Sequence, residues 1–375
     1  MLAGRQPTLD AFDVVRRRAE EFGEGDRSWI LNGLRGVGKT VLLNELLSRG
    51  NERGWITAKV EAGASVALPV ALSQGLVRAM RTATGRHPEK PLQRLLGVLK
   101  AFTLKVDPSG AVALGVDVQP LSGFADSGRF ADDLAGLFES LGETARELGI
   151  GVLVLVDELQ ESTPDDLTAI NTAVHHLGQQ DVPLPLTFVG AGLPSLPAQL
   201  ADATSYAERL YDYRPIGLLD EQAATEALTV PARGRGVDWD ADGLAAALAT
   251  AKGYPYFLQS IGKHVWDNAR TTPISAEDVD AGLREARREV DDGLYRSRWE
   301  RATPAQRDVL RALAELGGAD PAPVADIARR MGKARTSDIS VARVELIKKG
   351  LAYAPERGLL AFTVPGMDDF IARQP

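Results

Sequence analysis

Eight consecutive residues, Gly33 to Thr40, carry the clearest chemistry in this sequence of 375 residues. They read GLRGVGKT and fit G-x-x-x-x-G-K-[ST], in which glycines let backbone N–H groups turn toward phosphate. Lys39 would place a cation on the β- and γ-phosphates, and Thr40 would offer its hydroxyl to Mg²⁺. The setting also fits, because an apolar run precedes the motif and a helical pattern follows it. The residues expected to bind the nucleotide here are Gly33, Gly36, Val37, Gly38, Lys39, Thr40 and Val41.

A second motif consists of two adjacent carboxylates, Asp157 and Glu158, at the end of the apolar run Gly151 to Val156. In this position Asp157 can reach a metal ion and Glu158 can deprotonate an attacking water. A glutamate directly after the aspartate favours ATP hydrolysis over transfer to an acceptor, although a small-metabolite kinase remains an alternative. We find no Asn/Thr-Lys-x-Asp element that would read guanine, so adenine is the expected base.

Short apolar runs alternate with longer helical patterns, which is typical of an α/β fold with a parallel sheet flanked by helices. The expected strands are Ser28 to Leu31, Trp55 to Val60, Gly151 to Val156, Leu184 to Val189 and Arg209 to Arg214. A β-hairpin insertion is expected at about 102–118, where apolar residues alternate around Asp107-Pro-Ser-Gly110. These features predict an ATPase core over residues 1–217.

The rest of the chain predicts two further parts. Residues 218–300 have mostly helical periodicity and are expected to form a helical lid and a connecting helix. Residues 301–375 predict three helices and a strand pair around Pro355 to Gly358, the plan of a winged helix-turn-helix domain.

Taken together, GLRGVGKT, the Asp157-Glu158 pair and the predicted C-terminal winged helix resemble the AAA+ ATPases of the origin-recognition (Orc-like) and archaeal type and the related STAND ATPases. The resemblance implies a P-loop NTPase of the ASCE type that hydrolyses ATP to ADP with Mg²⁺. It places Arg5, in Leu2-Ala-Gly4-Arg5, near the adenine, and packs Pro255, in Gly253-Tyr-Pro255, on the base. A plain turn before a helix is the simpler interpretation of that last motif.

Two departures from these families bear on activity. Val189 to Pro194 lacks the usual polar sensor residue, and no sensor arginine stands near Pro255, so slow hydrolysis is expected. Arg209 lies where such families place an arginine finger that acts across a subunit boundary, which would require a homo-oligomer. A surface ion pair is the other interpretation of Arg209.

The C-terminal part leaves two kinds of partner open. From Thr303 onward the sequence has eleven basic and nine acidic residues. Several of the basic residues lie where a recognition helix and wing would meet duplex DNA. The alternative is a protein-facing or autoinhibitory module in a signalling ATPase that binds no DNA. The residues expected to contact DNA are Arg335, Ser337, Ser340, Arg343 and Arg357.

Composition excludes several other classes. A net charge of −8 argues against binding nucleic acid over the whole surface, and the lack of cysteine excludes disulfides, thiolate metal sites and cysteine nucleophiles. No leader or membrane-spanning run is evident, so we expect a cytoplasmic protein with no membrane partner. His175 and His176 point in different directions on a predicted helix and are expected to be structural.

Overall fold

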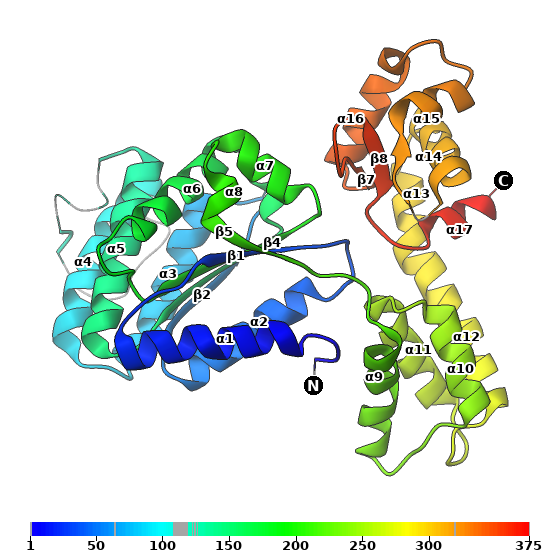
Figure 1. The fold of residues 1–375 in the computed structure, drawn as a ribbon, viewed down its shortest axis with the longest axis horizontal. Coiled ribbons are helices and arrows are strands. Elements are labelled where there is room, and N and C mark those ends of the chain that lie inside the picture. Colours follow the sequence, from blue (N-terminus) through cyan, green and yellow to red (C-terminus); the bar gives the residue numbers. More distant parts are fainter. Residues whose placement is uncertain are drawn as a thin grey trace.

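The computed structural model describes residues 2–63, 65–107, 119–121, 123, 125, 127–318 and 320–374. Its centre is a five-stranded parallel sheet in the order β2-β3-β4-β1-β5 (Figure 1). The predicted α/β class and all five predicted strands are confirmed. The strands are β1 Ser28–Asn32, β2 Ile56–Glu61, β3 Val152–Asp157, β4 Leu186–Gly192 and β5 Tyr211–Pro215.

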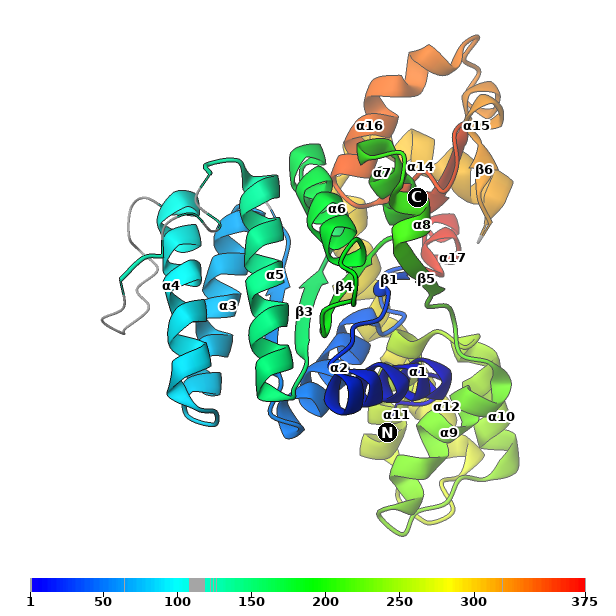
Figure 2. The same cartoon turned by 60° about the vertical axis from the view of Figure 1, so that its left-hand side comes forward.

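Helices cover both faces of this sheet, with α1 and α2 on one side and α5 and α6 on the other (Figures 1 and 2). Both central strands β3 and β4 are therefore buried along their whole length, as expected for a doubly covered parallel sheet. The core helices are α1 Gln6–Arg17, α2 Lys39–Glu52, α3 Leu68–Thr84, α4 Glu89–Val106, α5 Phe130–Leu148, α6 Pro164–Gly178, α7 Leu196–Ala203 and α8 Ala207–Leu210, with short helical segments η1 Arg18–Phe22 and η2 Leu159–Glu161.

The prediction of a β-hairpin at 102–118 is wrong for its first residues. Leu104 to Val106 form the last turn of α4, which packs between α3 and α5. Apolar residues at helical spacing on α4, such as Leu95, Leu99 and Phe102, are buried, and this packing outweighs the short alternation. The remainder of the expected hairpin, 108–118, lies outside the described residues.

The four helices expected after the sheet are present and form a separate cluster with its own small core. Aspartate or serine side chains cap three of them, at Asp220, Asp240 and Ser275, each accepting from a backbone N–H in the first turn. These helices are α9 Glu221–Arg233, α10 Ala241–Ala251, α11 Pro255–Asn268 and α12 Ala276–Glu289.

The C-terminal region contains the expected helices and a three-stranded antiparallel sheet in the order β6-β8-β7. It is joined to α12 by η3 and α13, which continue in the same direction (Figure 1). Val290, Tyr295 and Trp299 of this connection pack into the C-terminal core. The elements are η3 Val290–Arg296, α13 Ser297–Arg301, α14 Pro304–Gly317, β6 Ala322–Pro323, α15 Val324–Arg330, η4 Thr336–Ile339, α16 Ser340–Lys348, β7 Ala352–Tyr353, β8 Leu359–Phe362 and α17 Met367–Ala372.

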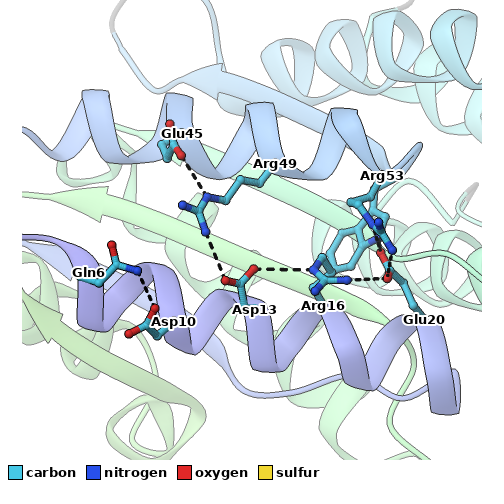
Figure 3. Close-up of polar contacts among 9 residues, drawn as sticks. Gln6, Asp10, Asp13, Arg16, Glu20, Glu45, Arg49 and Arg53 are labelled. Atoms are coloured by element: carbon cyan, nitrogen blue, oxygen red, sulfur yellow. Dashed lines mark hydrogen bonds and ion pairs between the residues drawn. The ribbon is translucent and has the colours of Figure 1, made fainter. Parts of the chain in front are cut away.

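An ion-pair network joins α1 and η1 to α2, the helix that begins at Lys39 (Figure 3). Arg49 of α2 reaches Asp13 at 3.3 Å, and Arg53 holds Glu20 through two bonds of 3.1 and 2.8 Å. Burial disfavours the charge of Glu20, but hydrogen bonds from Arg53 and Trp55 outweigh it and lower the pKa of this carboxyl. The network therefore ties α1 and η1 to the C-terminal half of α2.

No helix within the described ranges combines the length and the apolar character that a membrane span requires.

Asn171 provides a test of how α6, α7 and β5 are held together. Its fully buried side chain donates to Leu200 O at 3.0 Å and Thr204 Oγ1 at 2.8 Å, and accepts from Tyr211 Oη at 2.8 Å. Asn171→Ala leaves these groups unsatisfied and is expected to lower the free energy of unfolding by about 3 kcal/mol, measured by urea denaturation.

The control for this prediction is Thr168→Ala on the same helix. Among the described residues the Thr168 hydroxyl bonds only to Pro164 O one turn earlier, so its loss is expected to cost less than about 0.5 kcal/mol. Equal stability of the two variants would contradict the role assigned to Asn171.

Candidate nucleotide-binding site

The loop Gly33 to Gly38 connects β1 to α2 at the carboxyl edge of the sheet. Gly36 and Gly38 have positive φ angles of 77° and 98°, which other residues rarely adopt. A Cβ built on Gly38 would meet no heavy atom of the described residues within 4 Å, so the loop opens there. The helix α2 begins directly after Gly38, and the first N–H groups of a helix have no partner within it, which is the arrangement of an anion site at a helix N-terminus.

Lys39 lies beneath the loop with only 6% of its surface exposed. Its Nζ donates to Gly33 O and Leu34 O, both at 2.8 Å. Burial lowers the pKa of the Lys39 ammonium to about 8, although Glu158 and Asp157 oppose this change. The Lys39 ammonium is thus held by carbonyl groups of the phosphate loop itself.

Thr40 and Asp157 meet at the same edge of the sheet. Thr40 Oγ1 donates to Asp157 Oδ2 at 2.7 Å across 117 residues of chain. The backbone N–H of Glu158 donates to Asp157 Oδ1 at 3.0 Å. A hydroxyl and a carboxylate are oxygen ligands that Mg²⁺ prefers, and phosphates and water usually complete its shell. Within the described ranges no cluster of three or more metal-binding side chains exists that could hold an ion without them.

Glu158 follows Asp157 with a φ of 51°, a left-handed conformation that is unusual for a residue other than glycine. Its carboxylate Oε2 accepts from Gln160 Nε2 at 2.6 Å and lies 3.5 Å from Arg35 Nη2. The side chain therefore faces the phosphate loop, where a general base must stand.

A cavity of about 410 Å³ lies beside the loop, between the core and the lid. Arg5 and Pro255 line it together with Val37, Gly38 and Val41, so these five predicted residues surround one space. Arg5 donates to Val37 O at 2.9 Å and to Gly217 O at 2.7 Å, and burial lowers the pKa of its guanidinium. Arg5 thus fixes the cavity wall through backbone carbonyls.

Both the helical cluster α9 to α12, expected to be the lid, and the C-terminal region contact the phosphate loop. Tyr254 Oη donates to Arg35 O at 3.1 Å, and the Tyr256 N–H donates to Gly36 O at 3.2 Å. From the loop, the Arg35 N–H donates to Thr363 O at 3.0 Å, just after β8. The backbone of the loop is thus hydrogen-bonded to both parts.

Arg209 is not brought to this site. It is exposed at the amino edge of the sheet, before β5, and lines a cavity there with Arg18, Arg27 and His175. No ion-pair partner of its side chain occurs among the described residues, so the surface ion pair is not seen. Within one chain Arg209 cannot reach the loop at the opposite edge, and its role across a subunit boundary stays a prediction.

The residues expected to contact DNA lie on the C-terminal region, away from the phosphate loop. Arg335, Ser337 and Arg357 are exposed, whereas Ser340 and Arg343 are partly buried. Ser340 Oγ already donates to Ser337 O at 2.7 Å. Of the paired histidines, His176 bonds to Glu139 at 3.0 Å and His175 stacks on Tyr206, in agreement with structural roles.

Three residues at the site were not predicted from the sequence: Arg35, Gln160 and Tyr254. Arg35 occupies a variable position of the G-x-x-x-x-G-K-[ST] motif, so the pattern assigns it no role. Gln160 and Tyr254 stand next to motif residues, and their contacts depend on how distant segments meet. Proximity to Glu158 and Pro255 was the only available signal.

Two protein-family models match parts of this chain. A family model described as AAA ATPase domain matches residues 1–189, half of the chain. A second model, described as a domain of unknown function (DUF8462), matches residues 292–371. No curated protein matches the chain in sequence.

Solved structures with a similar fold cover nearly the whole chain. The Walker-type ATPase PABY2304 of Pyrococcus abyssi is 18% identical, with a TM-score of 0.52 over 92% of this chain and 90% of that one. The ORC2 protein of Aeropyrum pernix, in its ADPNP–ADP complexes, is 14% identical, with a TM-score of 0.56 over 98% and 93%. The ADP form of the same protein is also 14% identical, with a TM-score of 0.53 over 99% of this chain and 94% of that one. At these identities the likeness concerns the fold.

The lowered pKa of Lys39 predicts proton uptake on nucleotide binding. Phosphate stabilises the charged ammonium and raises its pKa again, so ADP binding at about pH 8.5 takes up a proton and weakens as pH rises through about 8. Calorimetric titration in two buffers of different ionisation enthalpy measures this uptake. Lys39→Arg keeps its charge at that pH and is expected to show none; equal uptake by both proteins would contradict the assignment.

Proposed function

This chain belongs to the AAA ATPase domain family, and from that premise we propose that it hydrolyses ATP to ADP and phosphate as a nucleotide-controlled switch. Lys39 and the loop N–H groups bind the phosphates, and the base and ribose lie in the cavity lined by Arg5 and Pro255. The complexes of the ORC2 protein with ADPNP and ADP support adenine nucleotides as ligands.

In the proposed reaction Glu158 is the general base. A water oxygen forms a bond to the γ-phosphorus as the bond from that phosphorus to the bridging oxygen of ADP breaks. The water proton passes to the Glu158 carboxylate and then to solvent. Mg²⁺, held by Thr40 and Asp157, would neutralise phosphate charge when bound.

The hydrogen bonds of the phosphate loop to both other parts of the chain carry the proposal of a switch. The loop donates through Arg35 to Thr363 and accepts through Arg35 and Gly36 from the lid. Because these bonds use the backbone of the loop that binds phosphate, ATP would order the C-terminal region in one orientation and hydrolysis would release it. We propose that this region is a winged helix, and that Arg209 of a neighbouring subunit in a homo-oligomer completes the site.

Glu158→Gln tests the reaction. The amide cannot accept a proton, so turnover is expected to fall about 100-fold or more while the affinity for ATP changes less than about threefold. Steady-state hydrolysis and nucleotide titration measure both quantities. Glu147→Gln on α5, exposed and away from the loop, is the matched control and should retain wild-type turnover.

The same variant tests the switch. With ATP trapped on Glu158→Gln, backbone amides of 351–364 should exchange hydrogen more slowly than with ADP, because the docked orientation protects them. Equal exchange with both nucleotides would reject the switch, and turnover by Glu158→Gln at the wild-type rate would reject Glu158 as base.

A second candidate function is association with duplex DNA through the C-terminal region. It is favoured by the exposed cations Lys333, Arg335 and Arg357, whose side chains form no ion pair with any of the described residues. The other candidate, a protein-facing or autoinhibitory module, is favoured by the contact of Thr363 with the phosphate loop.

Charge reversal separates these two functions. The double variant Arg335→Glu and Arg357→Glu is expected to bind a short duplex about tenfold more weakly than wild type at low salt, because phosphate contacts dominate affinity. Arg284→Glu with Arg296→Glu makes the same change of charge outside this surface. If wild type gives no salt-dependent binding, the protein-facing function stands.

A further inference from the structure

Gln160 joins the carboxylate of Glu158 to the loop that follows β4. Its Oε1 accepts from the Leu193 N–H at 3.1 Å, and its Nε2 donates to Glu158 Oε2 at 2.6 Å. The Leu193 N–H can only donate, so the amide oxygen must face it and the NH₂ group must face the carboxylate. The Leu193 N–H therefore fixes which way the Gln160 side-chain amide is turned.

The surrounding backbone leaves room for this amide. Gly192 ends β4, and a Cβ placed there would lie 2.6 Å from Gln160 Oε1. Any larger residue would push the amide away from Leu193 and Glu158. The left-handed conformation of Glu158 turns the chain directly after Asp157 and brings Gln160 back beside the carboxylate.

This contact uses one oxygen of the base and leaves the other available. Oε2 accepts from Gln160 and faces Arg35, whereas Oε1 has no hydrogen bond within the described ranges. A general base needs one free oxygen at a fixed position, within hydrogen-bond distance of the water that it deprotonates. The arrangement supplies that geometry before a nucleotide binds.

We infer that Gln160 is a positioning residue for hydrolysis, which orients Glu158 and couples it to the loop after β4. The sequence offers no polar sensor side chain over Val189 to Pro194, where β4 ends and the loop begins, and Gln160 reaches the Leu193 N–H there from η2, the short helix after β3. The inference rests on the proposed role of Glu158 as base. Gln160 itself acts only through Glu158 and contacts neither water nor phosphate in this role.

Two substitutions separate positioning from loop anchoring. Gln160→Glu has nearly the same shape and still accepts from the Leu193 N–H, but it cannot donate to Glu158 and repels it. Gln160→Ala loses both contacts, together with the exposed 3.3 Å bond from Nε2 to Glu161. Both variants are expected to lower kcat about 10- to 100-fold, with KM and the affinity for ATP changed less than about twofold.

Hydrogen exchange supplies a readout that does not depend on activity. Without nucleotide or metal, the Leu193 amide should lose protection in Gln160→Ala but keep it in Gln160→Glu. Gln180→Ala is the matched control, since the Gln180 amide also donates to a carboxylate, Glu139, but away from the site. This control is expected to keep wild-type kcat and Leu193 protection.

The outcomes are distinct. If Gln160→Glu keeps wild-type kcat while Gln160→Ala loses it, Gln160 only anchors the loop and the inference is overturned. It is likewise overturned if either variant hydrolyses faster than wild type, since Gln160 would then restrain the base. If wild type shows no turnover above Glu158→Gln, the proposed function fails first and the inference falls with it.

Discussion

The site depends on the order of the strands at the carboxyl edge of the sheet. Because β1 and β3 both flank β4, the phosphate loop after β1 and the carboxylates after β3 meet, and Thr40 lies 2.7 Å from Asp157. Gly33 N–H donates to Gly192 O at the end of β4, which fixes the loop against the same strand. A parallel sheet buried on both faces holds these ends rigidly, so the polar groups need no flexible segment to find each other.

Two cations, Lys39 and Arg35, lie at this edge of the sheet and are held by carbonyl groups as well as by a carboxylate. Lys39 is buried and bonded to loop carbonyls, while Arg35 stands 3.5 Å from Glu158 and its buried Nε lacks a hydrogen-bond partner in the described part of the chain. These cations lie beside the N-terminus of α2, and the Arg35 Nε–H is still available to donate a hydrogen bond. Such an environment suits a polyanion. The same Arg35 donates its backbone N–H to Thr363. One residue of the loop thus lies between the base and the C-terminal region.

Much of the fold could be predicted from local pattern. The four strands β1 to β4 were expected from short runs rich in apolar residues, as buried parallel strands require, whereas the polar edge strand β5 gave a weaker pattern. The hairpin near 102–118 shows the limit of this reasoning. The alternation at Leu104 and Val106 covers few residues, and the packing of α4 between α3 and α5 decided their conformation.

The sequence by itself determined the phosphate loop, the carboxylate pair and the five-stranded sheet, because each depends on residues adjacent in the chain. Tertiary structure alone decided what surrounds them. Tyr254 and Thr363 reach the phosphate loop, and Gln160 reaches the Leu193 N–H, through contacts between distant segments that no local pattern encodes. Likewise, Arg209 lies at the opposite edge because strand direction, and not its neighbours in sequence, fixes which end of β5 it precedes.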